Sequence, residues 1–348
     1  MWLRQLDMLS PPITLYYKRK NTHTSLISGV ITIVDCVFIL SFIILYIISY
    51  VKRESPKTYY FNRYVDDIGT FSFKDSNFFN YVQIYSGRSR IIKEYDFNKI
   101  EIIGINISIE GYEGLPDKAQ IPFWVYGRCD NKTDIKGIEH LLNYESFYKS
   151  ACIKSFYNNK KSKFYDIENE NFEWPIINLG VSHPNSSFYG VIVRKCENNS
   201  FRLQHFEECE SQEEIDLYIS SSFISFNTID HYVDVLNYEN PITKYIFTRN
   251  DLISSESYNT NNLNFFPGLV KSYDNLFNEN SVEKISYFFN HNSQTVSMRE
   301  NSTCLAAYFI WLQNTQQYYE RHYNKLYDLI PLIGGYGSAI IMVSKFIN

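Results

Sequence analysis

The sequence has few of the features that mark nucleic-acid-binding proteins, disulfide scaffolds and zinc proteins. Lysine and arginine total 33 against 38 acidic residues, and no long basic run occurs. This argues against a nucleic-acid-binding protein, because the phosphate backbone needs cationic partners. Only six cysteines occur in 348 residues, and none forms a Cys-x-x-Cys pair. We therefore expect no small disulfide scaffold, no metal site and no nucleic-acid partner.

Sequence signatures of enzymes are missing as well. The chain has no P-loop, no G-x-G-x-x-G after a strand, no G-x-S-x-G and no H-E-x-x-H motif. Only His231, with Asp230 and Asp234 nearby, resembles an acid–base cluster. Polar residues at the end of a strand explain this trio more simply than catalysis does. The sequence predicts no catalytic residue and no cofactor.

One long apolar segment runs from Leu26 to Val51 and carries a single charge, Asp35. At 1.5 Å per residue it exceeds the roughly 30 Å hydrocarbon core, so it can span a membrane with some tilt. The first 25 residues are polar and no cleavable signal peptide precedes the segment. We expect residues 26–51 to form a transmembrane helix that acts as an uncleaved signal anchor.

Asp35 is the most informative residue of this segment. An intramembrane carboxylate costs a few kcal/mol or more and usually faces a cavity, a partner helix or a water path. If the span begins near Gly29, however, Asp35 lies only about 9 Å from its start, where water also reaches. The functional and the water-accessible interpretations both stay open.

A second, shorter apolar segment covers residues 329–343 and extends to 347 only when Lys345 is included. Gly334 and Ser338 form a small-xxx-small pair, and with Gly335 and Gly337 they favour close approach of a neighbouring helix. We expect a second transmembrane helix over 329–347. The alternative is a buried C-terminal helix of the domain between the two apolar segments.

Two spans would place residues 1–25 on one side of the membrane and residues 52–328 on the other. Basic residues flank the first span equally on both sides, so the positive-inside rule does not decide the orientation. Cysteines favour an oxidising compartment for residues 52–328. Their spacing is compatible with two local bridges, Cys129 with Cys152 and Cys196 with Cys209, although the connectivity stays open. We expect a cytosolic N-terminal segment and an exoplasmic domain.

Five N-x-S/T sequons in residues 52–328 are candidate glycosylation sites: Asn106, Asn131, Asn185, Asn198 and Asn301. Sequons also arise by chance in a chain this rich in asparagine and serine. They permit an exoplasmic location and do not establish it.

The segment between the apolar runs is predicted to be β-rich. Isoleucines at 103, 105, 107 and 109 alternate with polar or small residues, as in a half-buried strand. Further strands are predicted at 121–126, 187–193, 221–229, 244–249 and 285–289. Helices are predicted over 133–150 and from Asn314 into the second apolar segment, and 155–170 is predicted to be an exposed hairpin or loop. The fold class is thus two transmembrane helices flanking one β-rich α+β exoplasmic domain with an antiparallel sheet.

Six segments together resemble a large group of two-pass transmembrane proteins from ciliates. They are PPITLYYKRKNTHTSLISGVITI (11–33), YFNRYVDDIGTF (60–71), SFYKSACIKSFYN (146–158), NFEWPIINLG (171–180), HYVDVLNYENPITKYIF (231–247) and QQYYERHYNKLYDLIPLIGGYGS (316–338). The resemblance implies a membrane protein without assigned chemistry. It also implies a chain that continues past the second span into a cytosolic tail.

Two other groups share fewer features with the chain. Ser28-Gly29 and Ile333-Gly334-Gly335 are similar to the span boundaries of ERGIC/Erv-type cargo receptors, although Val30 replaces a glycine. Epithelial-type sodium channels share the two-span plan with a large ectodomain. Their Gly-x-Ser filter and dense cysteines have no match here.

The sequence therefore predicts a non-enzymatic integral membrane protein of the endomembrane system or plasma membrane, whose exoplasmic domain binds a protein partner or cargo. The lipid bilayer is an expected partner, and a homo-oligomer is compatible with the glycines of the second segment. Two alternatives stay open. One is an oligomeric cation channel or ligand-gated pore, and the other is a membrane-anchored enzyme.

Overall fold

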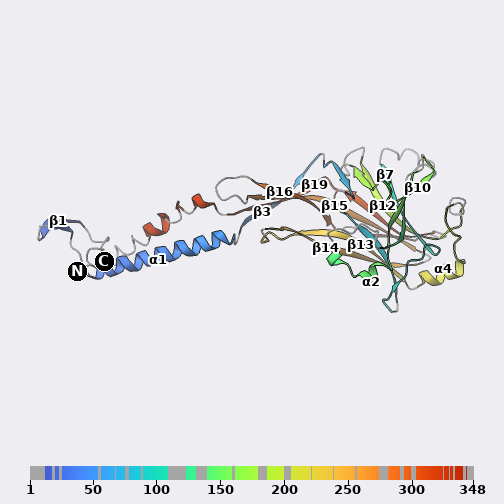
Figure 1. Cartoon of the computed structure of the whole chain (residues 1–348), viewed down its shortest axis with the longest axis horizontal. Coiled ribbons are helices and arrows are strands. Elements are labelled where there is room, and N and C mark those ends of the chain that lie inside the picture. Colours follow the sequence, from blue (N-terminus) through green and yellow to red (C-terminus); the bar gives the residue numbers. More distant parts are fainter. Residues whose placement is uncertain are drawn as a thin grey trace.

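The structure is a computed structural model that describes residues 12–17, 20–22, 26–53, 56–66, 68–74, 78–87, 89–108, 123–130, 139–158, 161–178, 186–199, 205–220, 222–237, 239–254, 257–273, 281–290, 294–298, 303–323, 325–328, 330–331, 334–339 and 342. These residues form a β-rich body and one long helix, α1 (Leu26–Val51), which projects away from it (Figure 1). Helix α1 coincides with the predicted apolar segment.

Helix α1 consists mainly of isoleucine, leucine, valine and phenylalanine, and few residues of its Gly29–Val51 part are buried. It ends where the apolar run ends, because Arg53 adopts a left-handed conformation with φ 52°. Among the described residues, α1 is the one helix long and apolar enough to cross a membrane. The predicted second span is described only in part, with helical backbone at 330–331, 334–339 and 342.

The other elements are short helices and many strands. The helices are η3 (Glu139–Leu141), α2 (Tyr144–Phe147), α4 (Gln212–Ile219) and η4 (Leu326–Asp328). The strands are β1 (Pro12–Tyr17), β2 (Lys20–Thr22), β3 (Lys57–Tyr64), β4 (Thr70–Ser72), β5 (Asn80–Ser86), β6 (Ile92–Lys93), β7 (Ile100–Ser108), β8 (Phe123–Arg128), β9 (Ala151–Asn158), β10 (Lys163–Asp166), β11 (Ile176–Asn178), β12 (Ser187–Lys195), β13 (Ser222–Val233), β14 (Ile242–Ile253), β15 (Ser257–Tyr273), β16 (Val282–Asn290), β17 (Gln294–Met298), β18 (Cys304–Leu312) and β19 (Thr315–His322).

Within the described residues, one 15-stranded sheet has the order β14-β13-β5-β9-β8-β7-β12-β18-β15-β19-β3, and β6, β10, β16 and β17 pair beside this path. The sequence predicts an antiparallel sheet. The observed sheet is mixed, because β15 runs parallel to both β18 and β19. The predicted strands at 187–193, 221–229, 244–249 and 285–289 are confirmed. The segment 155–170, predicted to be an exposed hairpin or loop, forms a hairpin of β9 and β10, but it is not wholly exposed because Phe156, Tyr157 and Tyr165 are buried.

The sheet curls so that β13 and β14 pack against β15 and β18. Phe226 of β13 stacks on Tyr308 of β18 with ring centroids 4.5 Å apart. Asp251 of β14 is fully buried and accepts hydrogen bonds from the Tyr308 hydroxyl (2.8 Å) and the Asn261 amide (2.9 Å). Burial and the Asp251 charge raise the pKa of Tyr308 well above its usual value, so its hydroxyl stays a donor. Asp251 therefore joins three strands across the core.

A second buried polar group lies where β7, β8 and β12 meet. The Tyr126 hydroxyl donates to Asn80 and lies 3.2 Å from the Tyr189 hydroxyl. Gly104 makes room for Tyr189, since a Cβ at this position would lie 1.9 Å from the tyrosine oxygen. Strand β7 thus has a glycine at the point where the Tyr189 ring lies against its backbone.

Two predicted helices are wrong. In the described part of 133–150, the chain forms only the short η3 and α2, because Asn143 caps a new turn and Phe147 then packs into a small core with Cys129 and Cys152. The helix predicted to start at Asn314 is instead strand β19, which pairs with β3 on one side and β15 on the other. Hydrogen bonding to two distant strands overrides the local helical pattern.

Candidate functional site

Strands β3, β19 and the end of β15 extend from the body toward α1 (Figure 1). We call these segments the neck, made of Lys57–Tyr64, Thr315–His322 and 268–273. Strand β3 follows α1 after a short connection and is the last strand of the sheet. All eight of its residues are exposed, which is unusual for a strand with four aromatic rings.

The register of the neck strands brings Lys57, His322 and Tyr273 into one cross-strand row. The Tyr273 ring stacks on the His322 ring with centroids 4.2 Å apart and planes at 12°. The Tyr59 ring meets His322 edge-on at 5.6 Å. Next to this row Phe61 stacks on Tyr318 at 4.7 Å. One face of the neck is thus an aromatic surface with cationic side chains at its α1 end.

A pocket of about 420 Å³ opens on this face at the end next to α1. It is lined by Lys57, Tyr59, Tyr273, His322, Tyr323, Lys325, Tyr327 and Asp328. Its walls combine four tyrosines, one histidine, two lysines and one aspartate. These residues come from three segments that lie far apart in the sequence.

Lys325 is the most buried charged residue of this pocket, with 5% of it exposed. Its Nζ donates to the Tyr273 carbonyl oxygen at 3.2 Å, and its backbone N–H donates to the Asp328 carboxylate at 2.8 Å. The Arg53 guanidinium, two residues past the end of α1, lies 6.0 Å from the centre of the Tyr323 ring in the pocket wall. The pocket therefore lies near the end of α1.

The other face of the neck is fixed to the body by Arg321, which is 2% exposed. Its guanidinium donates to the Ser272 hydroxyl and to the Asn237 carbonyl oxygen. Because adjacent strand residues point to opposite faces, these contacts hold His322 toward the pocket. A rigid backbone therefore supports the pocket.

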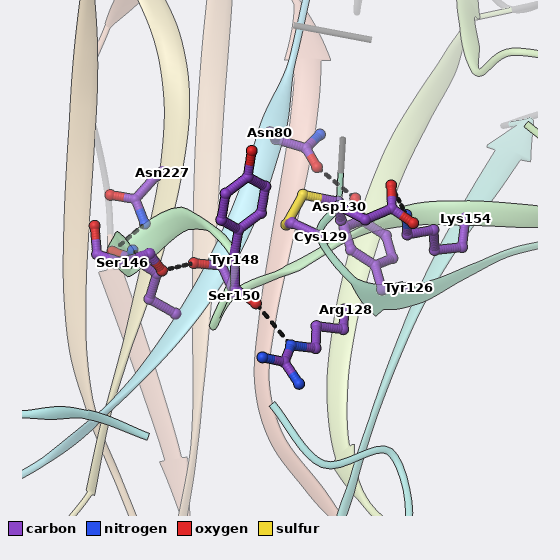
Figure 2. Close-up of a disulfide and its surroundings, with 12 residues drawn as sticks. Asn80, Tyr126, Arg128, Cys129, Asp130, Ser146, Tyr148, Ser150, Lys154 and Asn227 are labelled. Carbon is purple, nitrogen blue, oxygen red and sulfur yellow. Dashed lines mark hydrogen bonds and ion pairs between the residues drawn. A yellow bond between two sulfur atoms is a disulfide. The ribbon is translucent and has the colours of Figure 1, made fainter. Parts of the chain in front are cut away.

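The cysteine pairs suggested by the spacing are both joined in the structure. Cys129 and Cys152 connect the end of β8 to β9 with a Cα–Cα distance of 5.1 Å. Figure 2 shows this disulfide among polar contacts that fix the same strands. Arg128 donates to the Tyr148 carbonyl oxygen at 2.8 Å, and Lys154 lies 2.6 Å from the Asp130 carboxylate.

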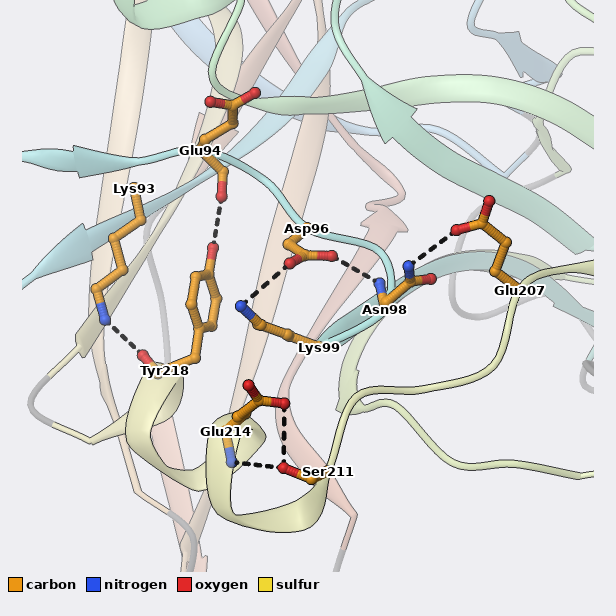
Figure 3. A network of polar contacts seen from close by, with 9 residues as sticks. All are labelled: Lys93, Glu94, Asp96, Asn98, Lys99, Glu207, Ser211, Glu214 and Tyr218. Carbon is orange, nitrogen blue, oxygen red and sulfur yellow. Dashed lines mark hydrogen bonds and ion pairs between the residues drawn. The ribbon is translucent and has the colours of Figure 1, made fainter.

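The second disulfide joins Cys196 to Cys209, which immediately precedes α4. Figure 3 shows how α4 is held: Ser211 and Glu214 cap its start, and the Tyr218 hydroxyl donates to the Glu94 carbonyl oxygen at 2.8 Å. The Lys93 ammonium lies over the Tyr218 ring, 4.7 Å from its centre. The Glu101 carboxylate is near both sulfur atoms, but oxidised sulfurs offer no thiolate to a metal ion.

Two of the predicted glycosylation sites lie in the described residues. Asn198 is exposed beside the second disulfide, and its Oδ1 accepts a hydrogen bond from the Cys209 N–H. Asn106 lies within β7, and its side-chain nitrogen donates to the Ile176 carbonyl oxygen at 2.6 Å. Asn198 is therefore the more accessible site. Asn131, Asn185 and Asn301 lie outside the described residues.

The candidate residues of the apolar segments are spread along the two segments. Asp35 is half-buried on α1. Tyr336 packs on Phe42, in the middle of α1, with ring centroids 4.7 Å apart. At Gly334, Gly335 and Gly337 a Cβ would meet nothing within 4 Å, and Ser338 is exposed. Within the described part of one chain, these small residues therefore make no close helix contact.

The acid–base candidate near His231 has a structural role. The buried Asp230 carboxylate accepts hydrogen bonds from the His231 backbone N–H at 2.7 Å and from the Tyr245 hydroxyl. Asp230 and Tyr245 face each other across β13 and β14. Partial burial of the Tyr245 hydroxyl and its hydrogen bond to the Asp230 carboxylate raise the pKa of Tyr245. The pair fastens two strands, as expected for polar residues near a strand end.

A family model described as "Uncharacterised 80 kDa protein N-terminal domain" matches residues 126–313, more than half of the chain. The chain belongs to this family. The family region starts in β8 and ends just after β18, so it includes both members of the second disulfide and the buried Asp251. Helix α1 and the neck strands β3 and β19 lie outside it.

No curated protein matches the chain. Among solved structures, a proton-activated chloride channel determined by cryo-EM is 9% identical with a TM-score of 0.28, and the match covers 92% of this chain and 96% of that one. The crystal structure of Erv41p is 7% identical with a TM-score of 0.29, and the match covers 75% of this chain and 99% of that one. Scores this low support no argument about function. The resemblance to ciliate proteins stays a prediction.

The sequence predictions did not identify the neck pocket. A helix that starts at Asn314 includes residues 315–322, and in a helix His322 could not pair with Lys57 and Tyr273. The run TQQYYERH contains the tyrosines that favour a strand, and this signal could have corrected the assignment. The contribution of Lys325 and Asp328 depends on a turn that no local pattern indicates.

Proposed function

We propose that this chain is a non-enzymatic membrane protein whose β-rich body is held at the exoplasmic membrane surface, where it binds a protein partner. The observation that carries the proposal is the exposed apolar surface of α1. Ten of its valine, leucine, isoleucine and phenylalanine residues are strongly exposed. Each stabilises a structure by about 1.5–3 kcal/mol when it leaves water. Their sum is comparable to the total stability of a domain, so lipid or protein must cover this helix.

The C-terminal segment supports a second span. Tyr336 contacts Phe42 near the middle of α1, and the described pieces of 330–342 follow α1 in Figure 1. If α1 lies in lipid, a segment that packs against its middle lies in lipid as well. We therefore propose a two-pass topology with residues 52–328 between the two spans.

The disulfides support the exoplasmic orientation. Cys129 and Cys152 are nearly fully buried in their own small core, and Cys196 is buried as well. Disulfides persist in the endoplasmic reticulum lumen and outside the cell, whereas the cytosol keeps thiols reduced. An exoplasmic body also agrees with the exposed sequon at Asn198.

The binding role rests on the neck rather than on a reactive centre. Among the described strands β3 stands at one edge of the sheet, and Tyr59, Tyr60 and Tyr64 are each more than half exposed. Backbone groups on a free edge and exposed tyrosines are typical of protein-binding surfaces. The acid–base candidate Asp230, by contrast, is occupied by the Tyr245 and His231 contacts.

An oligomeric pore is the second candidate function. Asp35 lies on α1, and the open surface at Gly334, Gly335 and Gly337 leaves room for a helix of a second copy. If α1 lines a pore, Asp35→Asn will change ion flux through reconstituted bilayers. Absence of conductance with the wild-type chain would count against this candidate.

The membrane anchor is tested by alkaline carbonate extraction of the full chain from expressing cells. We expect the wild-type chain to stay in the membrane pellet and the variant Leu40→Arg/Leu45→Arg to lose most of this retention. Leu217→Arg is the control, because Leu217 is a strongly exposed leucine on α4, outside the proposed span. Complete extraction of the wild-type chain would overturn the proposal.

A further inference from the structure

The neck pocket lies at the level where a membrane-spanning α1 would meet lipid headgroups. Lys57 follows the end of α1 by six residues, and the guanidinium of Arg53, two residues past that end, lies 6.0 Å from the centre of the Tyr323 ring. If α1 spans the membrane as proposed above, the pocket faces the interface between hydrocarbon and water.

The pocket offers charges of both signs in one small volume. Lys57 and Lys325 provide two ammonium groups, and Asp328 provides one carboxylate. Lys325 is the more buried of the two lysines, with 5% of it exposed. An anion in the pocket meets its ammonium group with less screening than at a fully exposed lysine.

Aromatic rings form the rest of the wall. Four tyrosines line the pocket together with the His322 ring that stacks on Tyr273. Cationic side chains already lie over two of these rings, Lys271 over Tyr273 and both Arg53 and Arg321 over Tyr323. Tyr59 and Tyr327 are each half or more exposed, and they are the rings that a ligand cation would meet. Aromatic faces attract ammonium and quaternary ammonium groups, and a nearby carboxylate strengthens that attraction. The pocket therefore suits a ligand with an anionic and a cationic end, at a volume of about 420 Å³ that is typical of small-molecule sites.

We propose that the neck pocket binds the headgroup of a zwitterionic membrane phospholipid, with the phosphate at Lys57 and Lys325 and the ammonium or choline group at Tyr59, Tyr327 and Asp328. The proposal rests on the membrane location proposed above. It gives the neck a specific role: a lipid held between α1 and β19 would fix the orientation of the body relative to the membrane surface.

The test uses the full chain, purified and delipidated in dodecyl maltoside. Thermal unfolding midpoints and native mass spectra are recorded with dihexanoylphosphatidylcholine, with dihexanoylglycerol, with phosphocholine and with inorganic phosphate. We expect one bound phosphatidylcholine per chain and a midpoint that rises with its concentration. Dihexanoylglycerol lacks the headgroup and should produce neither effect.

Lys57→Gln is the main variant, because Lys57 is exposed and its loss leaves the fold intact. Losing one charged contact should weaken phosphatidylcholine binding about tenfold. Tyr327→Ala should weaken binding of phosphatidylcholine more than that of dihexanoylphosphatidic acid, which has no ammonium group. Lys163→Gln removes an exposed lysine from the β10 hairpin and should change nothing.

Three results would overturn the proposal. They are equal effects of dihexanoylglycerol and phosphatidylcholine, equal effects of Lys57→Gln and Lys163→Gln, and binding of phosphocholine or inorganic phosphate as tight as that of the lipid. The last result would assign the pocket to soluble phosphate compounds. Carbonate extraction measures the membrane anchor separately, so a chain that stays in the pellet but binds no headgroup contradicts this inference alone.

Discussion

The body and the neck use the same residue types in opposite ways. In the body, Tyr189 and Tyr308 are fully buried and their hydroxyls pair with other side chains. In the neck, Tyr59 and Tyr64 are more than half exposed. Packing therefore fixes the aromatic residues of the body. The exposed rings of Tyr59 and Tyr64 have no such requirement and are available for lipid or a partner.

Substitutions of buried polar residues in the body should lower the free energy of unfolding most strongly. Asp251→Ala removes the acceptor for Tyr308 and Asn261 and leaves polar groups unpaired in the core. We expect a loss of about 3–5 kcal/mol in the free energy of unfolding. Denaturant unfolding of the full chain in detergent measures it. Asp166→Ala, on the exposed side of β10, is the control and should stay within about 0.5 kcal/mol of wild type.

Removal of the first disulfide should have a slightly smaller effect. The double variant Cys129→Ser/Cys152→Ser opens a loop with a sequence separation of 23 and should lose about 2–4 kcal/mol. Cys304→Ser changes a half-buried thiol that forms no disulfide and should cost less. Equal losses in the two variants would mean that the disulfide itself contributes little.

A glycine substitution tests the packing of the body in more detail. Gly104→Ala forces a methyl group against Tyr189 and should lose about 1–3 kcal/mol. Gly334→Ala, where nothing lies within 4 Å, should lose nothing. If Gly104→Ala were also neutral in the unfolding measurement, the close approach of Tyr189 to β7 would be wrong.

Substitution in the neck should change binding rather than stability. Tyr64→Ala lies on the free edge of β3, and its side chain is 63% exposed. The free energy of unfolding should change by less than about 0.5 kcal/mol. Crosslinking of the full chain in intact membranes, followed by mass spectrometry, should show fewer partner crosslinks than wild type. A large loss of stability would instead make β3 part of the packed body.

The elements that could be predicted from sequence are those with a strong local pattern. Helix α1 is a continuous apolar run, and the strands around Ile103 and Phe226 alternate or carry β-branched and aromatic residues. The curled sheet and the parallel pairing of β15 depend on contacts between distant segments. The neck pocket depends on them as well, because Lys57, Tyr273 and His322 meet only through the register of three strands.

The central claim is that α1 anchors an exoplasmic body, and protease protection in sealed microsomes tests it most directly. The full chain carries an N-terminal tag and is digested with and without detergent, with parallel deglycosylation and an Asn198→Gln variant. The account predicts that residues 52–328 are protected and disulfide-bonded, that the tag is digested, and that the glycosylated mass falls in the variant. Digestion of the body in sealed microsomes, with all cysteines reduced, would contradict it.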